Sequence, residues 1–325
     1  MRRREFLSGA AAVLFVTQRV AHAQQRLPIV GILTSGSLDA YESLLMAFRQ
    51  GLSETGYAEG RNVAIEARGA DGHFNRTNQL AQELVQRQLA VMVATGNGSA
   101  RAAQAASATI PLVFLSQGDP MQFGLVASLS RPGGNATGVA VLASDVLTKR
   151  LDLARTVAPA STPIALLINP KATEAESQVK EAEEAARRSG HPMLTFNASD
   201  PDEIHLAFEQ LKVQAVGSLV VSTDAFLFGQ RDRITALAIR HGVPAIYDRR
   251  EFAVAGGLVS YGTHYADAYR RMGSYTGKIL KGAKPADLPV EQTARFELVI
   301  NLKTAKIIGI DLAPTVLALA DEVIE

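Results

Sequence analysis

Short apolar runs alternate with amphipathic stretches along this chain, and this alternation most limits the fold it can adopt. Runs such as Pro28–Thr34 and Pro111–Ser116 are continuous and β-rich, which is typical of strands buried on both faces. Between such runs lie stretches such as Asp39–Thr55, which puts Leu44 and Phe48 on one helical face. The alternation predicts an α/β fold, with parallel sheets covered by helices on both faces.

The same pattern predicts the remaining elements and restarts near Asp145, which indicates two successive lobes. The tail after about Leu258 is too short for a third domain, so it must pack onto both lobes and cross between them. Further strands are expected over residues 62–68, 90–95, 163–168, 193–197, 218–222, 244–247, 258–261 and 297–301. Further helices are expected over residues 75–88, 99–107, 145–157, 173–189, 201–211, 228–241 and 265–280, with a last helix ending near Ile324.

The N-terminus predicts export. Arg2 to Arg4 form a basic start, Phe6–Thr17 is a short apolar stretch, and Ala21-His22-Ala23 provides a small-x-small cleavage pattern. Residues 1–23 are therefore expected to be a signal peptide. Arg3 and Arg4, followed by Glu5-Phe6-Leu7, fit the twin-arginine route, and an ordinary Sec signal fits as well. The expected destination is the periplasm.

Composition excludes several kinds of partner. The chain has no cysteine, which rules out disulfides, a thiolate metal site and a cysteine-linked lipid anchor. Its 33 basic and 32 acidic residues nearly balance and are interspersed, so no nucleic-acid partner is expected. No later stretch has the length and apolar character of a membrane span, so we expect no direct membrane anchor.

Polar side chains come directly after the predicted strands. Ligands of open parallel sheets bind at this place, outside the carboxyl ends of the strands. Several are hydroxyls or amides suited to a small polar solute, and some precede helix starts that favour an anion. Helix capping is the alternative role for each of them. The candidate ligand-binding residues are Ser35, Ser37, Thr95, Gly96, Asn97, Ser116, Gln117, Asp119, Asn169, Thr223, Asp224, Tyr247 and Tyr261.

Catalytic patterns are missing from the sequence, so no catalytic residue, metal or cofactor is expected and the chain is not expected to be an enzyme. Gly96-Asn97-Gly98 is not a dinucleotide fingerprint, because Arg101 stands where the third glycine belongs. The histidines are scattered without metal-ligand spacing. Arg249 and Arg250, followed by Glu251, fit a ligand carboxylate, but a solvated helix start with a local ion pair is the preferred interpretation.

Several stretches together resemble the ABC-transporter substrate-binding family that includes the tryptophan-type binding proteins. The resemblance runs over essentially the whole chain after the signal segment. The stretches are Ile110–Phe114 with Asp119-Pro120, Gly124–Leu129, Arg131–Val139, Glu251-Phe252 with Gly256–Gly262, Tyr269–Arg271 and Phe296–Ala305.

This resemblance implies the type I periplasmic-binding-protein fold, with two similar lobes, three crossovers and a ligand cleft between the lobes. The expected lobes are residues 27–143 plus 262–295 and residues 144–261 plus 296–325. Lobe closure would capture a small polar solute, such as an amino acid, and a monomer would then dock on an ABC permease with its ATPase. Residues at matching strand ends are Ser37, Asn97, Ser116, Asn169, Asp224 and Tyr247.

Two alternatives to import remain open at this point. The same fold would serve a periplasmic sensory subunit that presents its closed state to a membrane receptor. An exported enzyme is the other alternative, which the lack of a catalytic pattern disfavours.

Overall fold

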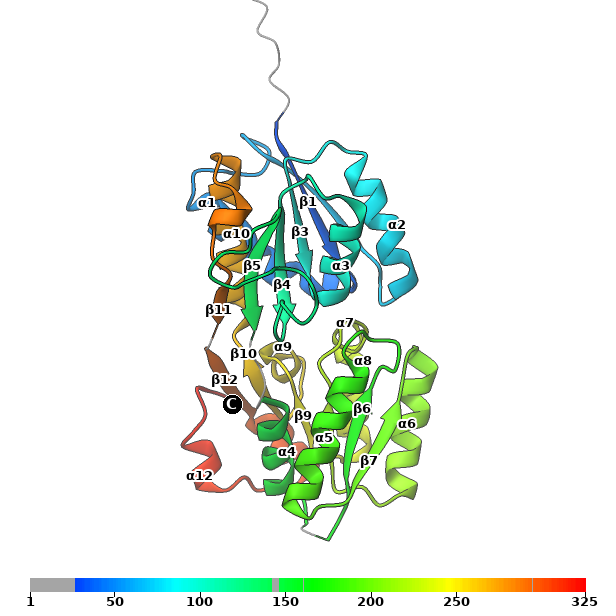
Figure 1. Cartoon of the computed structure of the whole chain (residues 1–325). Coiled ribbons are helices and arrows are strands. Elements are labelled where there is room, and N and C mark those ends of the chain that lie inside the picture. Colours follow the sequence, from blue (N-terminus) through cyan, green and yellow to red (C-terminus); the bar gives the residue numbers. More distant parts are fainter. Residues whose placement is uncertain (1–26, 142–145, 160, 294) are drawn as a thin grey trace, which may run out of the picture.

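In a computed structural model that describes residues 27–141, 146–159, 161–293 and 295–325, the chain forms two lobes (Figure 1). Each lobe has a central, mostly parallel sheet with helices on both faces. The predicted two-lobed α/β fold is therefore confirmed. The predicted signal peptide lies outside the described residues. No helix in the described part of the chain has the length and apolar character needed to cross a bilayer.

The first lobe is built on a six-stranded sheet in the order β11-β5-β4-β3-β1-β2, and all its strand pairs are parallel. Helices α1 and α10 cover one face, and α2 and α3 cover the other. Its elements are β1 (Ile29–Thr34), the 3-10 turn η1 (Asp39–Tyr41), α1 (Glu42–Ser53), β2 (Ala64–Gly69), α2 (Phe74–Val85), β3 (Val91–Thr95), α3 (Asn97–Ala106), β4 (Leu112–Gln117), β5 (Ala136–Val141), α10 (Tyr265–Leu280), η2 (Pro285–Asp287) and β11 (Glu291–Thr293).

The second lobe is built on a seven-stranded sheet in the order β13-β12-β10-β9-β8-β6-β7, in which only β10 and β12 are antiparallel neighbours. Its strands are β6 (Ile164–Ile168), β7 (Met193–Asn197), β8 (Ser218–Val221), β9 (Ala245–Tyr247), β10 (Val259–Thr263), β12 (Phe296–Asn301) and β13 (Glu322–Ile324). Its helices are α4 (Val146–Thr156), α5 (Ala175–Ser189), α6 (Pro201–Val213), α7 (Ala225–Gly229), α8 (Arg231–His241), α9 (Arg250–Val254), α11 (Leu302–Ile308) and α12 (Pro314–Leu317).

Burial on both faces of each sheet explains the continuous apolar runs. Successive strand residues point to opposite faces. In β1, Ile32 packs into the cluster on the α1 and α10 face, whereas Leu33 packs into the cluster on the α2 and α3 face. Because both faces are covered, both positions must be apolar.

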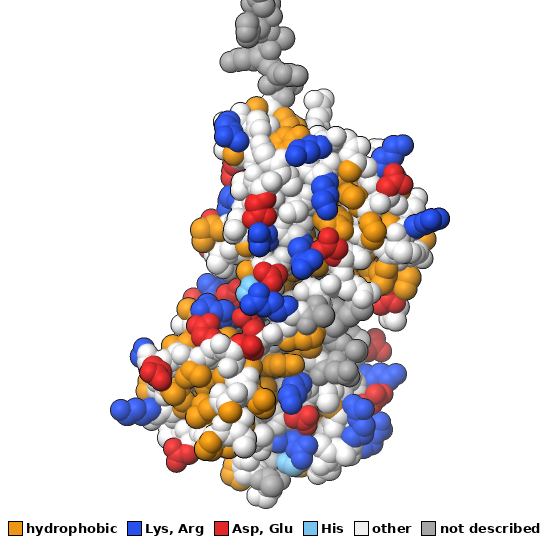
Figure 2. All heavy atoms as spheres, turned by 90° about the vertical axis from the view of Figure 1, so that its left-hand side faces the viewer, with side chains coloured by type: hydrophobic (Ala, Val, Ile, Leu, Met, Phe, Trp, Pro, Cys, Tyr) orange, Lys and Arg blue, Asp and Glu red, His pale blue; other side chains and the backbone are white. Residues whose placement is uncertain are grey.

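The chain passes between the two sheets three times: between β5 and α4, between β10 and α10, and between β11 and β12. Strand β10 runs on to Thr263 in the second sheet, so the return to the first lobe follows Thr263 rather than residue 261. Charged side chains gather between the two lobes on the face shown in Figure 2. Arg295 and Asp267, which lie in the segments next to the crossings, have side chains 3.1 Å apart. Exposed ion pairs of this kind add little stability, so the crossings depend mainly on packing.

Some predicted elements need correction. The prediction of a last helix ending near Ile324 is wrong. Gly309, with φ at +71°, ends α11, and the chain finishes in β13, which pairs with β12. Strands β5, β11 and β13 were not expected, because β5 is rich in small residues and the other two are three residues long. The helix expected over 228–241 is two helices, the first of which begins directly after Asp224.

The returning helix α10 packs on α1 at very close range. A Cβ atom added at Gly51 would lie 1.8 Å from the backbone oxygen of Arg270, and one added at Gly273 would lie 2.1 Å from that of Phe48. Only glycine allows the two backbones to approach this closely. This contact holds the returning segment on the first lobe.

We therefore expect Gly51→Ala to destabilise the protein even though alanine is the better helix former. The clash is with backbone that cannot move independently, and overpacking of this kind costs about 1–3 kcal/mol of unfolding free energy. Urea unfolding of the two proteins measures the difference. Gly134→Ala is the matched control, because a Cβ added there meets nothing within 4 Å. Equal stability of Gly51→Ala and the unchanged protein would contradict the close approach.

Candidate functional site

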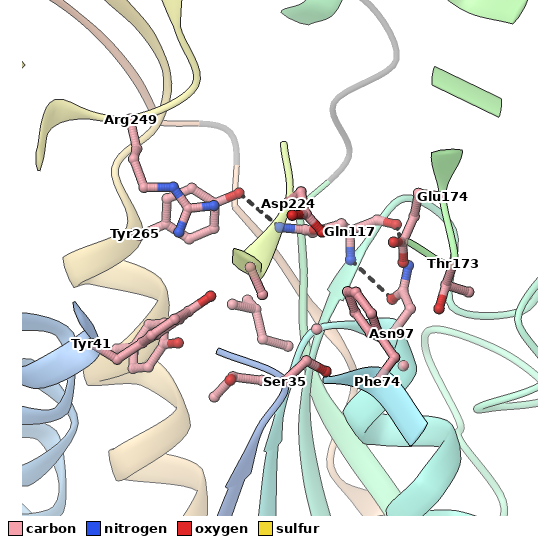
Figure 3. Close-up of a pocket in the computed structure, with 16 residues that line it drawn as sticks. Ser35, Tyr41, Phe74, Asn97, Gln117, Thr173, Glu174, Asp224, Arg249 and Tyr265 are labelled. Atoms are coloured by element: carbon pink, nitrogen blue, oxygen red, sulfur yellow. Dashed lines mark hydrogen bonds between the residues drawn. The ribbon is translucent and has the colours of Figure 1, made fainter. Parts of the chain in front are cut away.

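A cavity of about 510 Å³, counted out to its opening to solvent, lies where the two lobes meet (Figure 3). Both lobes contribute to its wall, which has charged, hydroxyl-bearing and aromatic side chains. From the first lobe come Ser35, Tyr41, Phe74, Thr95, Gly96, Asn97, Gly98, Leu115, Gln117, Tyr265 and Tyr269, and from the second Thr173, Glu174, Asp224, Ala225 and Arg249.

The lobes are in contact around this cavity, so the arrangement is closed. A Cβ atom added at Gly72 of the first lobe would lie 2.9 Å from the side chain of Phe226 in the second. Tyr41 and Phe228 meet edge to face across the boundary, with ring centroids 5.1 Å apart. One apolar cluster includes both of these rings and continues into each lobe.

Arg249 is a charged group held rigidly at one end of the cavity. Its side chain is 3% exposed, and its Nε and Nη2 atoms donate to Asp248 Oδ2 at 2.9 and 2.8 Å. The guanidinium carbon lies 4.3 Å from the ring centroids of both Phe228 and Tyr265, which belong to different lobes. Its Nη1 group takes no part in the Asp248 pair. A guanidinium fixed in this way can donate to a carboxylate without losing side-chain entropy on binding.

Asp224 provides a buried acceptor in the second lobe. It is 6% exposed, and its Oδ1 accepts from Leu227 N at 2.8 Å, as the N-cap of α7, and from Asn169 Nδ2 at 3.2 Å. Burial raises the pKa of Asp224 to about 6, although these hydrogen bonds act to lower it. The group is therefore ionised at neutral pH at an energetic cost that a bound cation would offset.

The start of α3 forms the opposite wall, and the side chain of Asn97 fixes its position. Asn97 Oδ1 accepts from Ser116 Oγ at 2.8 Å and from Gln117 N at 3.1 Å, while Nδ2 donates to Gln117 O at 2.7 Å. No side chain caps this helix. The carboxyl of Glu174, from the second lobe, interacts with the Asn97 side chain at this helix start. Burial raises the pKa of Glu174, and the hydrogen bond with Asn97 acts to lower it.

Tyrosine hydroxyls line the end of the cavity near Arg249. Burial raises the pKa of Tyr41 to about 12 and raises that of Tyr265 as well, so both hydroxyls keep their protons. The Tyr265 hydroxyl accepts from Gln117 Nε2 at 3.1 Å. The buried hydroxyls of Thr95 and Tyr269 act on each other, and neither has another hydrogen-bond partner among the described residues. When one donates to the other, the second keeps its proton for a solute.

Six of the thirteen residues predicted from strand ends lie in the cavity wall. They are Ser35, Thr95, Gly96, Asn97, Gln117 and Asp224.

The other seven lie outside the wall. Ser116 and Asn169 stand directly behind it, bonded to Asn97 and Asp224 respectively. Ser37 and Asp119 accept from the nearby backbone N–H groups of Ala40 and Met121, a local role in turns. Thr223 bonds Arg150 and Gln178. Tyr247 is fully buried on Phe252, and Tyr261 stacks on Phe296.

The preferred interpretation of Arg249 and Arg250 as a solvated helix start is wrong for Arg249, which is buried between two rings. Arg250 is partly exposed, and it pairs with Glu322 of β13 at 2.8 Å rather than with its neighbour Glu251. Sequence reasoning also missed Tyr41, Phe74, Thr173, Glu174, Tyr265 and Tyr269. The spacing of Tyr265 and Tyr269, four residues apart on one helical face, was a usable signal.

Comparison with known proteins agrees with this arrangement. A family model described as ABC transporter substrate binding protein matches residues 29–324. A tyrosine-binding protein of Clostridioides difficile (strain R20291) is 27% identical over 285 residues, which cover 87% of this chain and 80% of the relative.

Among solved structures, the ABC domain of a Streptococcus pneumonia protein in complex with L-Trp has a TM-score of 0.81 at 25% identity, covering 92% of this chain and 100% of that one. The ligand-free, open structure of a Clostridium difficile substrate binding protein with adhesive properties has a TM-score of 0.63 at 23% identity, covering 92% and 99%. The predicted type I periplasmic-binding-protein fold is confirmed. The chain belongs to the ABC transporter substrate-binding protein family.

Proposed function

We propose that this chain is the exported solute-binding component of an ABC importer and that it captures an α-amino acid between its lobes. The observation that carries the proposal is the polarity of the cavity. In the view of Figure 3, Arg249 lies at one end and Glu174 at the other, with Asp224 between them. A zwitterion needs donors and acceptors separated in this way.

The α-ammonium group would bind Asp224, whose carboxylate is buried without a cation. The α-carboxylate would receive hydrogen bonds from Arg249 and from the neighbouring hydroxyls of Thr95 and Tyr269. Phe74 and Tyr41 add aromatic surface to the wall. The relatives that bind tyrosine and L-Trp support an amino acid as the solute class.

Lobe closure would be the working step. Asp224 and Arg249 belong to the second lobe and Thr95 and Tyr269 to the first, so a solute contacts all four only in the closed state. A ligand that binds one state better shifts the population towards that state. The closed form would then be recognised by a membrane permease and its ATPase. This role requires export to the periplasm, which the predicted signal peptide would direct.

We infer that the chain binds its solute without converting it. Among the described residues, the cavity wall contains no histidine or cysteine. Its two carboxyl groups are not hydrogen-bonded to a side chain that could act as a nucleophile with its base. Capture and release of a solute require only that the two lobes close and open.

A thermal-shift screen of the mature protein against amino acids, small carboxylates and nucleosides tests the solute class. We expect an α-amino acid at a hundredfold excess over its Kd to raise the Tm by roughly 5–10 °C, because it binds only the folded state. A rise with nucleosides or plain carboxylates alone would overturn the amino-acid assignment.

Asp224→Asn tests the ammonium site. The amide oxygen can still cap α7 and accept from Asn169, so the fold should persist while the charge is lost. We expect affinity for the amino acid to fall about 10- to 100-fold, the range for a charge-assisted hydrogen bond. Calorimetric titration measures this change, and Asp232→Asn, at an exposed position of α8, is the control. Unchanged affinity in Asp224→Asn would remove Asp224 from the site.

Solute affinity should also depend on pH. The ammonium binds the ionised form of Asp224, and the pKa of this group in the unbound protein is about 6. As the pH falls below 6, the proton and the solute compete, so the Kd should rise by up to tenfold per pH unit. Burial raises the pKa of Glu174 as well, so protonation of Glu174 also has to be separated from that of Asp224, whereas Tyr41 keeps its proton throughout. Titrations between pH 5 and 8 on the unchanged protein and Asp224→Asn separate the two acids, since the variant should lose the Asp224 component (about one pH-linked proton).

A further inference from the structure

Glu174 is a second carboxyl in the cavity. In the proposed binding mode, the α-ammonium and α-carboxylate groups of the amino acid bind other residues, so neither of them explains Glu174. It enters from the second lobe just before α5, whereas Asp224 enters just before α7 (Figure 3). The two acids influence each other, since the charge on Asp224 raises the pKa of Glu174. Two like charges held together in a buried place are unfavourable unless something positive or hydrogen-bond-donating lies against them.

No cation of the described protein fills this need. Neither Asp224 nor Glu174 forms an ion pair within the described residues, and the one arginine in the wall is paired with Asp248. Arg150, a second buried arginine in this lobe, acts on Asp248 and donates to Val221 O and Thr223 Oγ1 rather than to either acid. A zwitterionic solute would add no net positive charge beside the two acids.

The hydrogen bonds distinguish the two acids. Asp224 Oδ1 accepts from Leu227 N and Asn169 Nδ2, and the backbone N–H groups of Ala225 and Phe226 also act on this carboxyl. Glu174 Oε1 is shut off from solvent and has no hydrogen-bond partner among the described residues. One N–H of the Asn97 amide donates to Gln117 O, and the other acts on the Glu174 carboxyl, but Oε1 of that carboxyl is still left without a partner among the described residues. A buried acceptor without a partner is costly, so the position calls for a donor.

We propose that the solute carries a hydrogen-bond donor on its side chain, besides its α-ammonium group, and that Glu174 accepts from this donor. With Arg249 at one end of the cavity and Asp224 in the middle, the side chain extends towards Phe74 and Glu174 (Figure 3). The solute class is therefore amino acids whose side chains bear an O–H or N–H group. This inference rests on the proposed function and narrows it.

Pairs of amino acids that differ mainly in the terminal donor test the inference. Tyrosine against phenylalanine tests a hydroxyl, and lysine against norleucine tests a charged nitrogen. Calorimetric titration of the mature protein should show that the donor-bearing member of at least one pair binds about tenfold or more tightly. The pair that shows the larger ratio distinguishes the neutral from the charged donor.

Variants of Glu174 establish whether this residue makes the distinction. Glu174→Met removes the acceptor at similar length, so the ratio within the pair should fall to near one while the donor-free member keeps its affinity. Glu174→Gln keeps an oxygen acceptor without the charge, so it should preserve more of a hydroxyl preference than of a charged-nitrogen preference. Glu176→Gln, on the exposed face of α5, is the matched control and should change neither ratio.

The outcomes separate this inference from the proposed function. Equal binding of both members of each pair, or a donor preference that survives in Glu174→Met, overturns the inference and leaves amino-acid capture standing. Failure of every amino acid to bind a protein that is folded by circular dichroism overturns the proposed function itself.

Discussion

The close packing of α10 on α1 is the contact on which the rest of the structure depends. Gly51 and Gly273 let the two helix backbones approach to a distance that no larger residue permits. This contact attaches the segment that returns from the second lobe, so it carries β11 to the edge of the first sheet. It also places Tyr265 and Tyr269 in the cavity wall. A packing constraint far from the solute therefore sets one side of the site.

Charge in the cavity is arranged by a few buried groups in the second lobe. Asp248 holds Arg249, and rings from both lobes cover the faces of its guanidinium. Asp224 and Glu174 lack such a counter-charge. A buried charge without a partner is costly for folding, and binding sites commonly retain such charges because the ligand completes them. The closed arrangement thus has a strong donor at one end and unfilled acceptors towards the other.

Strand-end reasoning located part of the site because the carboxyl ends of parallel strands meet at one edge of each sheet. Ser35, Thr95, Gln117 and Asp224 reached the cavity wall in this way. Tyr247 did not, although it also ends a strand, because its side chain points into the core and stacks on Phe252 with ring centroids 4.6 Å apart. The sequence shows that a residue stands at the end of a strand. Whether its side chain points into the cavity or into the core depends on which other elements pack there.

The alternation of apolar runs and amphipathic stretches was enough to determine two α/β lobes. Burial on both faces of a sheet requires continuous apolar runs, and such runs are a local pattern in the sequence. The environment of Arg249 was decided only by the tertiary structure. In the sequence it is one of two arginines at a helix start, identical in kind to Arg250. It becomes a buried donor because Phe228 and Tyr265, from distant segments and different lobes, close over it. Contacts between residues far apart in the chain leave no local pattern, and the cavity of this protein is made of such contacts.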